Sequence, residues 1–184
     1  MKEWSDASTL HDARGYGTVS DGPFAVRRTG ANDWAALRAI RLEALSDTPE
    51  AFGSTFEMAS NYSNDQWRTM AAQRCYFLAE RDGVVVGMIS GGLNDEHPGA
   101  LWLYGMYLTT SVRGSGVGAV LVAAVEEWAR GEGASELFLE VTSSVVRARA
   151  FYSKMGFAPN GESRTMTRDP SLELITMRRS LVDA

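Results

Sequence analysis

A glycine-rich turn that joins an apolar strand to a helix constrains this chain more than any other feature. Residues 101–108 are apolar enough for a buried strand, and a helical pattern of apolar residues begins at residue 117. Three glycines stand at alternate positions of the junction: Gly114, Gly116 and Gly118. Glycine permits positive φ and a close approach of the backbone to a ligand. The N–H groups at a helix start carry partial positive charge and lack partners within the helix. Such a turn can bind a pyrophosphate, to which Arg113 would add a fixed positive charge.

The same glycines can instead serve only close packing, and the pattern alone leaves both interpretations open. The spacing does exclude other loops. It is neither the G-x-G-x-x-G of dinucleotide folds nor the G-K-[ST] of a Walker loop. Gly114-Ser115-Gly116 is not the G-x-S-x-G elbow of a hydrolase either.

The composition is that of one globular domain without a basic surface. The 184 residues are 45% hydrophobic and 22% charged. Since 18 Lys and Arg stand against 23 Asp and Glu, we expect no nucleic-acid partner. Cys75 is the single cysteine and lies in an apolar run, which predicts a buried thiol rather than a disulfide or a nucleophile. With only His11 and His97, a Ser-His-Asp triad or a His-rich metal site lacks parts, so we expect no metal.

Neither a signal peptide nor a membrane span is expected. The N-terminus has no apolar stretch, and the longest apolar run, Val117 to Val125, is too short to cross a bilayer. The expectation is a cytoplasmic protein with no membrane partner.

The order of predicted elements indicates a mixed sheet flanked by helices. Residues 1–22 lack periodicity and are expected to form a flexible tail, followed by a single domain over residues 23–184. Strands are expected at 24–28, 76–80, 84–90, 101–108, 137–141, 162–167 and 172–179. Helices are expected after the caps at Asn32-Asp33, Ser63-Asn64-Asp65 and Ser144, and from residue 117 to a C-cap at Gly131. Turns are expected at 82–83 and 169–171, and irregular chain at 50–57.

Two motifs resemble those of the GCN5-related N-acetyltransferases (GNAT). The first, Arg113-x-x-Gly116-x-Gly118 after an apolar strand, looks like the family's acyl-CoA signature. The second is similar to a strand–helix segment of the family and comprises Leu139-Glu140-Val141, Ala148, Ala150, Phe151-Tyr152 and Lys154-Met155-Gly156-Phe157. A weaker resemblance to the family extends over residues 24–181. Within the family, the chain looks like a bacterial subgroup of unassigned substrate.

The resemblance implies a fold and a cosubstrate. The fold is that of acyl-CoA N-acyltransferases, an α/β (α+β) arrangement with a central mixed, mostly antiparallel sheet of about seven strands and four flanking helices. The cosubstrate is acetyl-CoA. In the family, the strand before the glycine turn bulges, its backbone pairs with the pantetheine arm, and one of its N–H groups polarises the thioester carbonyl. The cofactor-binding residues implied here are Met106, Tyr107, Leu108, Arg113, Gly114, Ser115, Gly116, Val117 and Gly118.

The resemblance also implies catalytic roles. Tyr152 matches the tyrosine that protonates the departing sulfur, and a phenol with a pKa of about 10 keeps its proton at neutral pH. Glu140 matches the base of the related ribosomal-protein alanine acetyltransferases, although a glutamate there can simply line the sheet. Many relatives place the base on the preceding strand, where this chain has Trp102 and Tyr104, so a water relay is one alternative for the base. Glu57, near the expected acceptor pocket, is another.

Some positions depart from the family pattern or have a simpler interpretation. Val145 stands where the family often has an asparagine that contacts the CoA arm, so that contact is not carried over. Arg147, Arg149 and Lys154 could meet the adenosine phosphate, but a solvated helix face is the favoured interpretation.

The acceptor pocket of this fold is built by the first two helices, their connection and the split strands. These parts contribute aromatic residues, of which we single out Phe52, Phe56, Trp67 and Trp102 as substrate-binding. The expected activity is transfer of acetyl from acetyl-CoA to a primary amine of a small molecule. The alternatives are a protein N-terminal or lysine acetyltransferase and a non-catalytic acyl-CoA-binding module. Family members are often dimers, so a homodimer is one possible oligomeric state.

Overall fold

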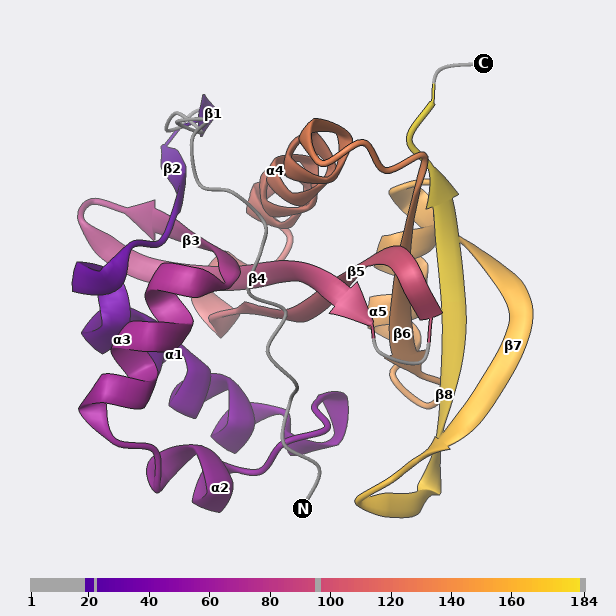
Figure 1. Cartoon of the computed structure of the whole chain (residues 1–184), viewed down its shortest axis with the longest axis horizontal. Coiled ribbons are helices and arrows are strands. Elements are labelled where there is room, and N and C mark those ends of the chain that lie inside the picture. Colours follow the sequence, from indigo (N-terminus) through magenta and orange to yellow (C-terminus); the bar gives the residue numbers. More distant parts are fainter. Residues whose placement is uncertain (1–18, 22, 95–96, 183–184) are drawn as a thin grey trace.

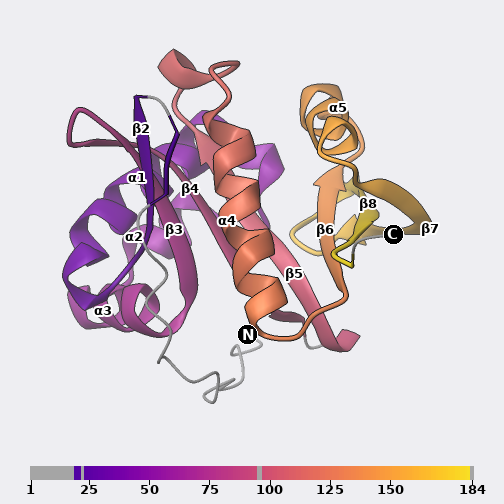
Figure 2. The same cartoon turned by 90° about the horizontal axis from the view of Figure 1, so that it is seen from above.

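The computed structural model describes residues 19–21, 23–94 and 97–182, which form a single sheet with helices on both faces (Figures 1 and 2). The strands within these ranges are β1 (Val19–Asp21), β2 (Phe24–Arg28), β3 (Cys75–Arg81), β4 (Val84–Asn94), β5 (His97–Leu108), β6 (Glu136–Thr142), β7 (Ala158–Met166) and β8 (Asp169–Ser180). Their order across the sheet is β1-β2-β3-β4-β5-β6-β8-β7, and β5–β6 is the parallel pair among antiparallel neighbours. The predicted mixed, mostly antiparallel sheet is confirmed.

The short strand β1 is an addition to the predicted elements. It pairs with β2 and lies within the stretch 1–22 that the sequence assigns to a tail. The remainder of that stretch, residues 1–18 and 22, lies outside the described residues.

Five helices accompany the described part of the sheet. They are α1 (Trp34–Asp47), α2 (Phe56–Ser60), α3 (Asn64–Gln73), α4 (Val117–Gly131) and α5 (Val146–Lys154), with short 3₁₀ turns at Ala31–Asp33, Pro49–Ala51 and Thr110–Val112. The one-turn α2 replaces part of the irregular chain expected at 50–57. It forms because Thr55 caps it, its hydroxyl accepting a hydrogen bond from the Met58 N–H at 3.2 Å.

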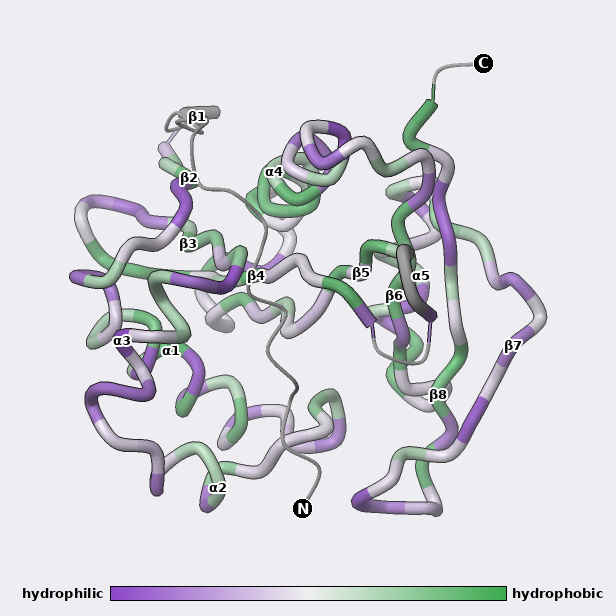
Figure 3. The backbone as a smooth tube through the Cα atoms, in the orientation of Figure 1, coloured by the Kyte–Doolittle hydropathy of each residue, from purple (hydrophilic) through white to green (hydrophobic). Residues whose placement is uncertain are grey.

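The helices cover opposite faces of the sheet, and the strands alternate accordingly. Along β3, Phe77 and Ala79 pack in the cluster that contains α4 and α5, whereas Leu78 packs in the cluster that contains α1 and α3. Figure 3 shows α4 as largely hydrophobic and the peripheral β7 as largely hydrophilic. In the described ranges, no helix combines the length and apolar character needed to cross a bilayer.

Several local signals act as the sequence predicts. Ser63 and Gln66 form a reciprocal capping box at the start of α3, with hydrogen bonds of 2.8 and 3.2 Å. Asp82 and Gly83 both adopt positive φ, 53° and 76°, in the tight β3–β4 hairpin.

Three predicted boundaries are wrong. The C-terminal glycine of α4 is Gly133 rather than Gly131, because its N–H bonds to Arg130 and that of Ala134 bonds to Ala129, which is a Schellman arrangement. The N-cap of α5 is Val145, and the Ser144 side chain makes no capping hydrogen bond. The β7–β8 turn is formed by residues 167–168, because Asp169 already pairs with Met166.

Candidate functional site

The central strands separate halfway along their length. The pairing of β5 with β6 covers residues 101–103 and 137–139. Beyond it the two strands diverge (Figure 2). On its other edge, β5 shifts register against β4 between Tyr104 and Tyr107, where Gly105 adopts a φ of 60°. This β-bulge adds one residue to β5, and Met106 lies beyond the last pair of the β5–β6 ladder.

The glycine turn follows β5 directly and supplies a second set of backbone donors. Gly114 and Gly116 have φ values of 83° and 94°, and Gly116 is the N-cap of α4. A Cβ added to either glycine would meet nothing within 4 Å, so the space above the turn is open. The N–H groups of Val117 and Gly118 lie in the first turn of α4 and have no acceptor within the helix.

Gly118 has a different role from the other two glycines. A Cβ at this position would lie 2.9 Å from Cε of Met106 and 3.2 Å from Cζ of Phe151. Gly118 therefore lets α4 pack closely against β5 and α5. The close-packing interpretation of the glycines therefore applies to Gly118.

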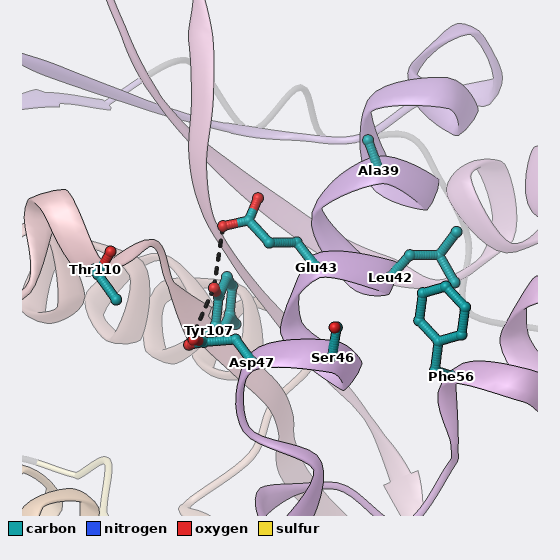
Figure 4. Close-up of a pocket in the computed structure, with 8 residues that line it drawn as sticks. All are labelled: Ala39, Leu42, Glu43, Ser46, Asp47, Phe56, Tyr107 and Thr110. Atoms are coloured by element: carbon teal, nitrogen blue, oxygen red, sulfur yellow. Dashed lines mark hydrogen bonds between the residues drawn. The ribbon is translucent and has the colours of Figure 1, made fainter.

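The Arg113 side chain turns toward α1. Its guanidinium forms an ion pair with Asp47, and its Nε donates to the Leu108 carbonyl oxygen at 3.0 Å. The Tyr107 hydroxyl donates to Glu43 and Asp47 at 3.1 and 3.3 Å (Figure 4). The hydrogen bond from Arg113 lowers the pKa of Asp47, while burial and the two carboxylates raise the pKa of Tyr107. These contacts link the glycine turn to the C-terminal end of α1.

Glu43, Asp47 and Tyr107 border a shallow cavity of about 670 Å³ between α1, α2 and β5 (Figure 4). The aromatic residue at its far side is Phe56, which is 48% exposed. Of the four aromatics predicted to bind substrate, Phe56 thus lies outside the opening between β5 and β6.

A larger cavity of about 960 Å³ occupies that opening. Its lining includes Phe52, Met106, Glu140 and Tyr152, which the sequence singled out from four distant parts of the chain. Val145, at the position where the family often has asparagine, also lines it. The structure therefore brings the bulge, both candidate catalytic residues and one predicted acceptor residue to one cavity.

Tyr152 lies deep in this cavity. Its ring packs edge-on against Phe151 and Phe157, at centroid distances of 5.3 and 5.9 Å, and the residue is 8% exposed. Burial raises the pKa of the phenol above its usual value. The hydroxyl therefore keeps its proton throughout the neutral range, as a proton donor must.

Glu140 is bound by an arginine. Both of its carboxylate oxygens accept hydrogen bonds from Arg164 on β7, each at 2.6 Å. Glu140 therefore borders the cavity as one half of an ion pair between β6 and β7.

The remaining candidate residues are two tryptophans of the core, a tyrosine that lines the central cavity and an exposed glutamate. Trp67 and Trp102 are core residues, 2% and 1% exposed, and line neither cavity; Trp102 stacks on Phe138 at 5.4 Å. Tyr104 lines the central cavity and donates to the Leu93 carbonyl oxygen at 3.3 Å. Glu57 is exposed on α2, away from both cavities.

On α5, Arg147, Arg149 and Lys154 are exposed, as expected of a solvated face. Across the described ranges, no group of three or more His, Cys, Asp and Glu could hold a metal ion.

The sequence reasoning missed the arginines of the central cavity. Arg28, Arg41, Arg74, Arg164 and Arg168 all line it. For Arg41 a signal existed, because it lies four residues after Leu37 and four before Leu45, on the buried stripe of α1. A charged residue on an apolar stripe predicts a side chain that is recessed from bulk solvent.

The comparisons with known proteins agree with this geometry. The sequence model of the acetyltransferase (GNAT) family matches residues 36–157. An uncharacterized N-acetyltransferase of Methanocaldococcus jannaschii is 30% identical over 137 residues, which cover 72% of this chain and 76% of that protein. Human N-acetyltransferase 8 is 33% identical over 93 residues, 48% of this chain, and this chain spans only 40% of the human protein.

Among solved structures, a protein assigned as an acetyltransferase of Salmonella typhimurium, with its cofactor acetyl-CoA, superposes with a TM-score of 0.71. The match covers 88% of this chain and 95% of that chain at 19% identity, which shows the shared fold. The chain belongs to the GNAT acetyltransferase family.

Proposed function

We propose that this protein transfers the acetyl group of acetyl-CoA directly to a primary amine of a small molecule. The observation that carries the proposal is the opening between β5 and β6, with the glycine turn next to it and Tyr152 inside it. The Salmonella structure that contains acetyl-CoA supports the choice of donor.

The residues present fit such a donor. The open space above Gly114 and Gly116 accommodates a pyrophosphate against the N-terminus of α4, whose N–H groups favour negative charge. Met106 lies beyond the β5–β6 ladder, where its backbone would pair with an amide-containing arm and with the thioester carbonyl oxygen.

The chemistry then needs two proton movements. The protonated amine loses one proton to water, and the neutral amine attacks the thioester carbonyl carbon; the carbon–sulfur bond breaks and its electron pair leaves on sulfur. Tyr152 donates its proton to that sulfur, and the second proton of the new amide nitrogen restores the phenol. Because Glu140 is held in a bidentate ion pair with Arg164, we assign the first step to a water relay through the cavity rather than to Glu140.

The walls of the cavity favour a small acceptor over a protein. Arg168, in the β7–β8 turn, donates to the Phe52 carbonyl oxygen at 2.8 Å and also contacts the Pro49 carbonyl oxygen. Thr142 on β6 donates to the Glu50 carbonyl oxygen at 3.0 Å. These contacts tie the chain between α1 and α2 across the opening, which narrows the groove that a protein acceptor would need.

An acceptor panel tests the activity. Thiol release from acetyl-CoA is measured with amino acids, polyamines, aminoglycosides and short peptides, while CoA binding is measured separately by calorimetry. Release accelerated by a small amine supports the proposal. Release with peptides alone favours a protein acceptor, and binding without release by any amine favours a non-catalytic acyl-CoA-binding module.

A glycine substitution tests the donor site. Gly116→Glu should weaken acetyl-CoA binding by about a hundredfold or more, because a carboxylate would stand above the turn where the pyrophosphate binds. Calorimetry measures the affinity. Gly133→Glu is the matched control, since Gly133 has the same open surroundings and a φ of 83° at the other end of α4. Equal loss of affinity in both variants would show strain rather than a binding site.

A further inference from the structure

The central cavity has the opposite sign of charge from the protein as a whole. The chain carries a formal net charge of −5, yet the charged residues that line this cavity are five arginines and one glutamate. Glu140 is already neutralised by Arg164 at 2.6 Å, and Arg168 donates to backbone carbonyl oxygens. The lining of the cavity thus contains more positively than negatively charged side chains.

Arg41 is the arginine best placed to use that charge. It extends from α1 into the cavity, and its guanidinium lies 4.7 Å from the centroid of the Phe52 ring. Ser54 accepts one hydrogen bond from Nη2, at 2.8 Å. Across residues 19–21, 23–94 and 97–182, no carboxylate forms an ion pair with it.

Such an arrangement is costly unless an anion completes it. A recessed cation without a counter-ion loses hydration, and burial accordingly lowers the pKa of Arg41. A guanidinium has five N–H donors in one plane; packing over the Phe52 ring uses none of them, and Ser54 accepts from one. This planar set of donors matches a carboxylate, which accepts two parallel hydrogen bonds.

The position of Arg41 relates this anion site to the reacting groups. A Cβ added to Gly105 would lie 3.1 Å from Nη1 of Arg41, so the guanidinium packs against the β5 bulge itself. Met106, whose backbone would hold the thioester, is the next residue along β5. A carboxylate on Arg41 would therefore hold an acceptor beside the bulge.

We propose that the acceptor is an amino carboxylate, a small amine that also carries a carboxylate, and that Arg41 binds this carboxylate as the main determinant of substrate specificity. The inference rests on the proposed function and names the substrate class of the same site. It excludes polyamines and aminoglycosides, whose positive charges would face the Arg41 guanidinium.

The test compares acceptors that differ only in the carboxylate. Phenylalanine, phenylalaninamide and phenethylamine, with the same series for other side chains, are assayed by thiol release with the wild-type protein. For the best series, kcat/KM should be at least about tenfold higher for the amino acid than for its amide. Arg41→Met should remove this preference while leaving acetyl-CoA affinity unchanged, and Arg41→Lys should restore part of it. Arg38→Met, which removes an arginine of α1 that lines neither cavity, should keep the preference.

The outcomes separate this inference from the proposed function. Acetylation of amides and amines as fast as amino acids would overturn the role of Arg41 but keep the acetyltransferase. Absence of thiol release in every series would count against the proposed function. Calorimetry of amino acids with the CoA-bound protein then decides the site: binding that disappears in Arg41→Met supports it, and no binding overturns it. The comparison of ligands on the wild-type protein decides the matter even if Arg41→Met does not fold.

Discussion

At the scale of single residues, the Tyr152 hydroxyl offers the sharpest test of the chemistry. The ring contacts with Phe151 and Phe157 do not involve the oxygen, so Tyr152→Phe keeps the packing. We expect kcat to fall about a hundredfold, which is typical of a lost general acid, and acetyl-CoA affinity to stay the same. Steady-state kinetics and calorimetry measure the two effects. Tyr62→Phe, which removes a phenol on the α3 side, is the control. Turnover of Tyr152→Phe at the wild-type rate would remove this tyrosine from the mechanism.

At the scale of elements, the ion pair between Asp47 and Arg113 joins the end of α1 to the glycine turn. Arg113 lowers the pKa of Asp47, so Asp47 stays charged to a lower pH in the folded protein than in the unfolded chain, where its pKa is about 3.9. The stabilisation is therefore complete at neutral pH and is lost as the pH falls through the lowered value.

Asp47→Asn should accordingly lower Tm at pH 7, and the difference from wild type should shrink below about pH 4. Thermal unfolding across this pH range measures the effect. Asp65→Asn breaks an exposed pair with Arg68 within α3 and should leave Tm nearly unchanged at either pH. If Asp47→Asn still lowers Tm in acid, the loss of stability comes from packing rather than from the ion pair.

At the scale of the whole molecule, the alkylation rate of Cys75 measures how readily the protein unfolds. It is the only cysteine of the chain, it is buried, and burial raises the pKa of its thiol to about 12. Alkylation by iodoacetamide should therefore require unfolding. Acetyl-CoA at about a hundred times its Kd should slow alkylation about a hundredfold, because only the folded protein binds it.

Mass spectrometry of the alkylated protein measures the rate, with and without the ligand. CoA analogues without the adenosine part, which bind weakly, give the control for nonspecific effects. Alkylation that acetyl-CoA does not slow would show that β3 opens on its own, without disruption of the donor site.

Local signals in the sequence were enough for most elements of the fold. The capping box of Ser63 and Gln66 and the hairpin at Asp82-Gly83 depend on residues close in the chain, so they could be predicted. The boundaries at Gly133 and Asp169 could not, because several turn residues compete locally and neighbouring contacts choose among them. The glycine turn was predictable for the same local reason, as positive φ at Gly114 and Gly116 is a property of the backbone itself.

The sequence by itself therefore determined the family, the sheet and the turn that would bind a pyrophosphate. Only the tertiary structure decided which side chains share the central cavity. It placed Phe52 there but Trp67 and Trp102 in the core, paired Glu140 with Arg164, and left Arg41 in the cavity without a carboxylate partner among the described residues. The physical reason is that a turn depends on the dihedral angles of a few neighbouring residues. The charge and shape of a cavity depend instead on side chains that only the packing of distant elements brings together.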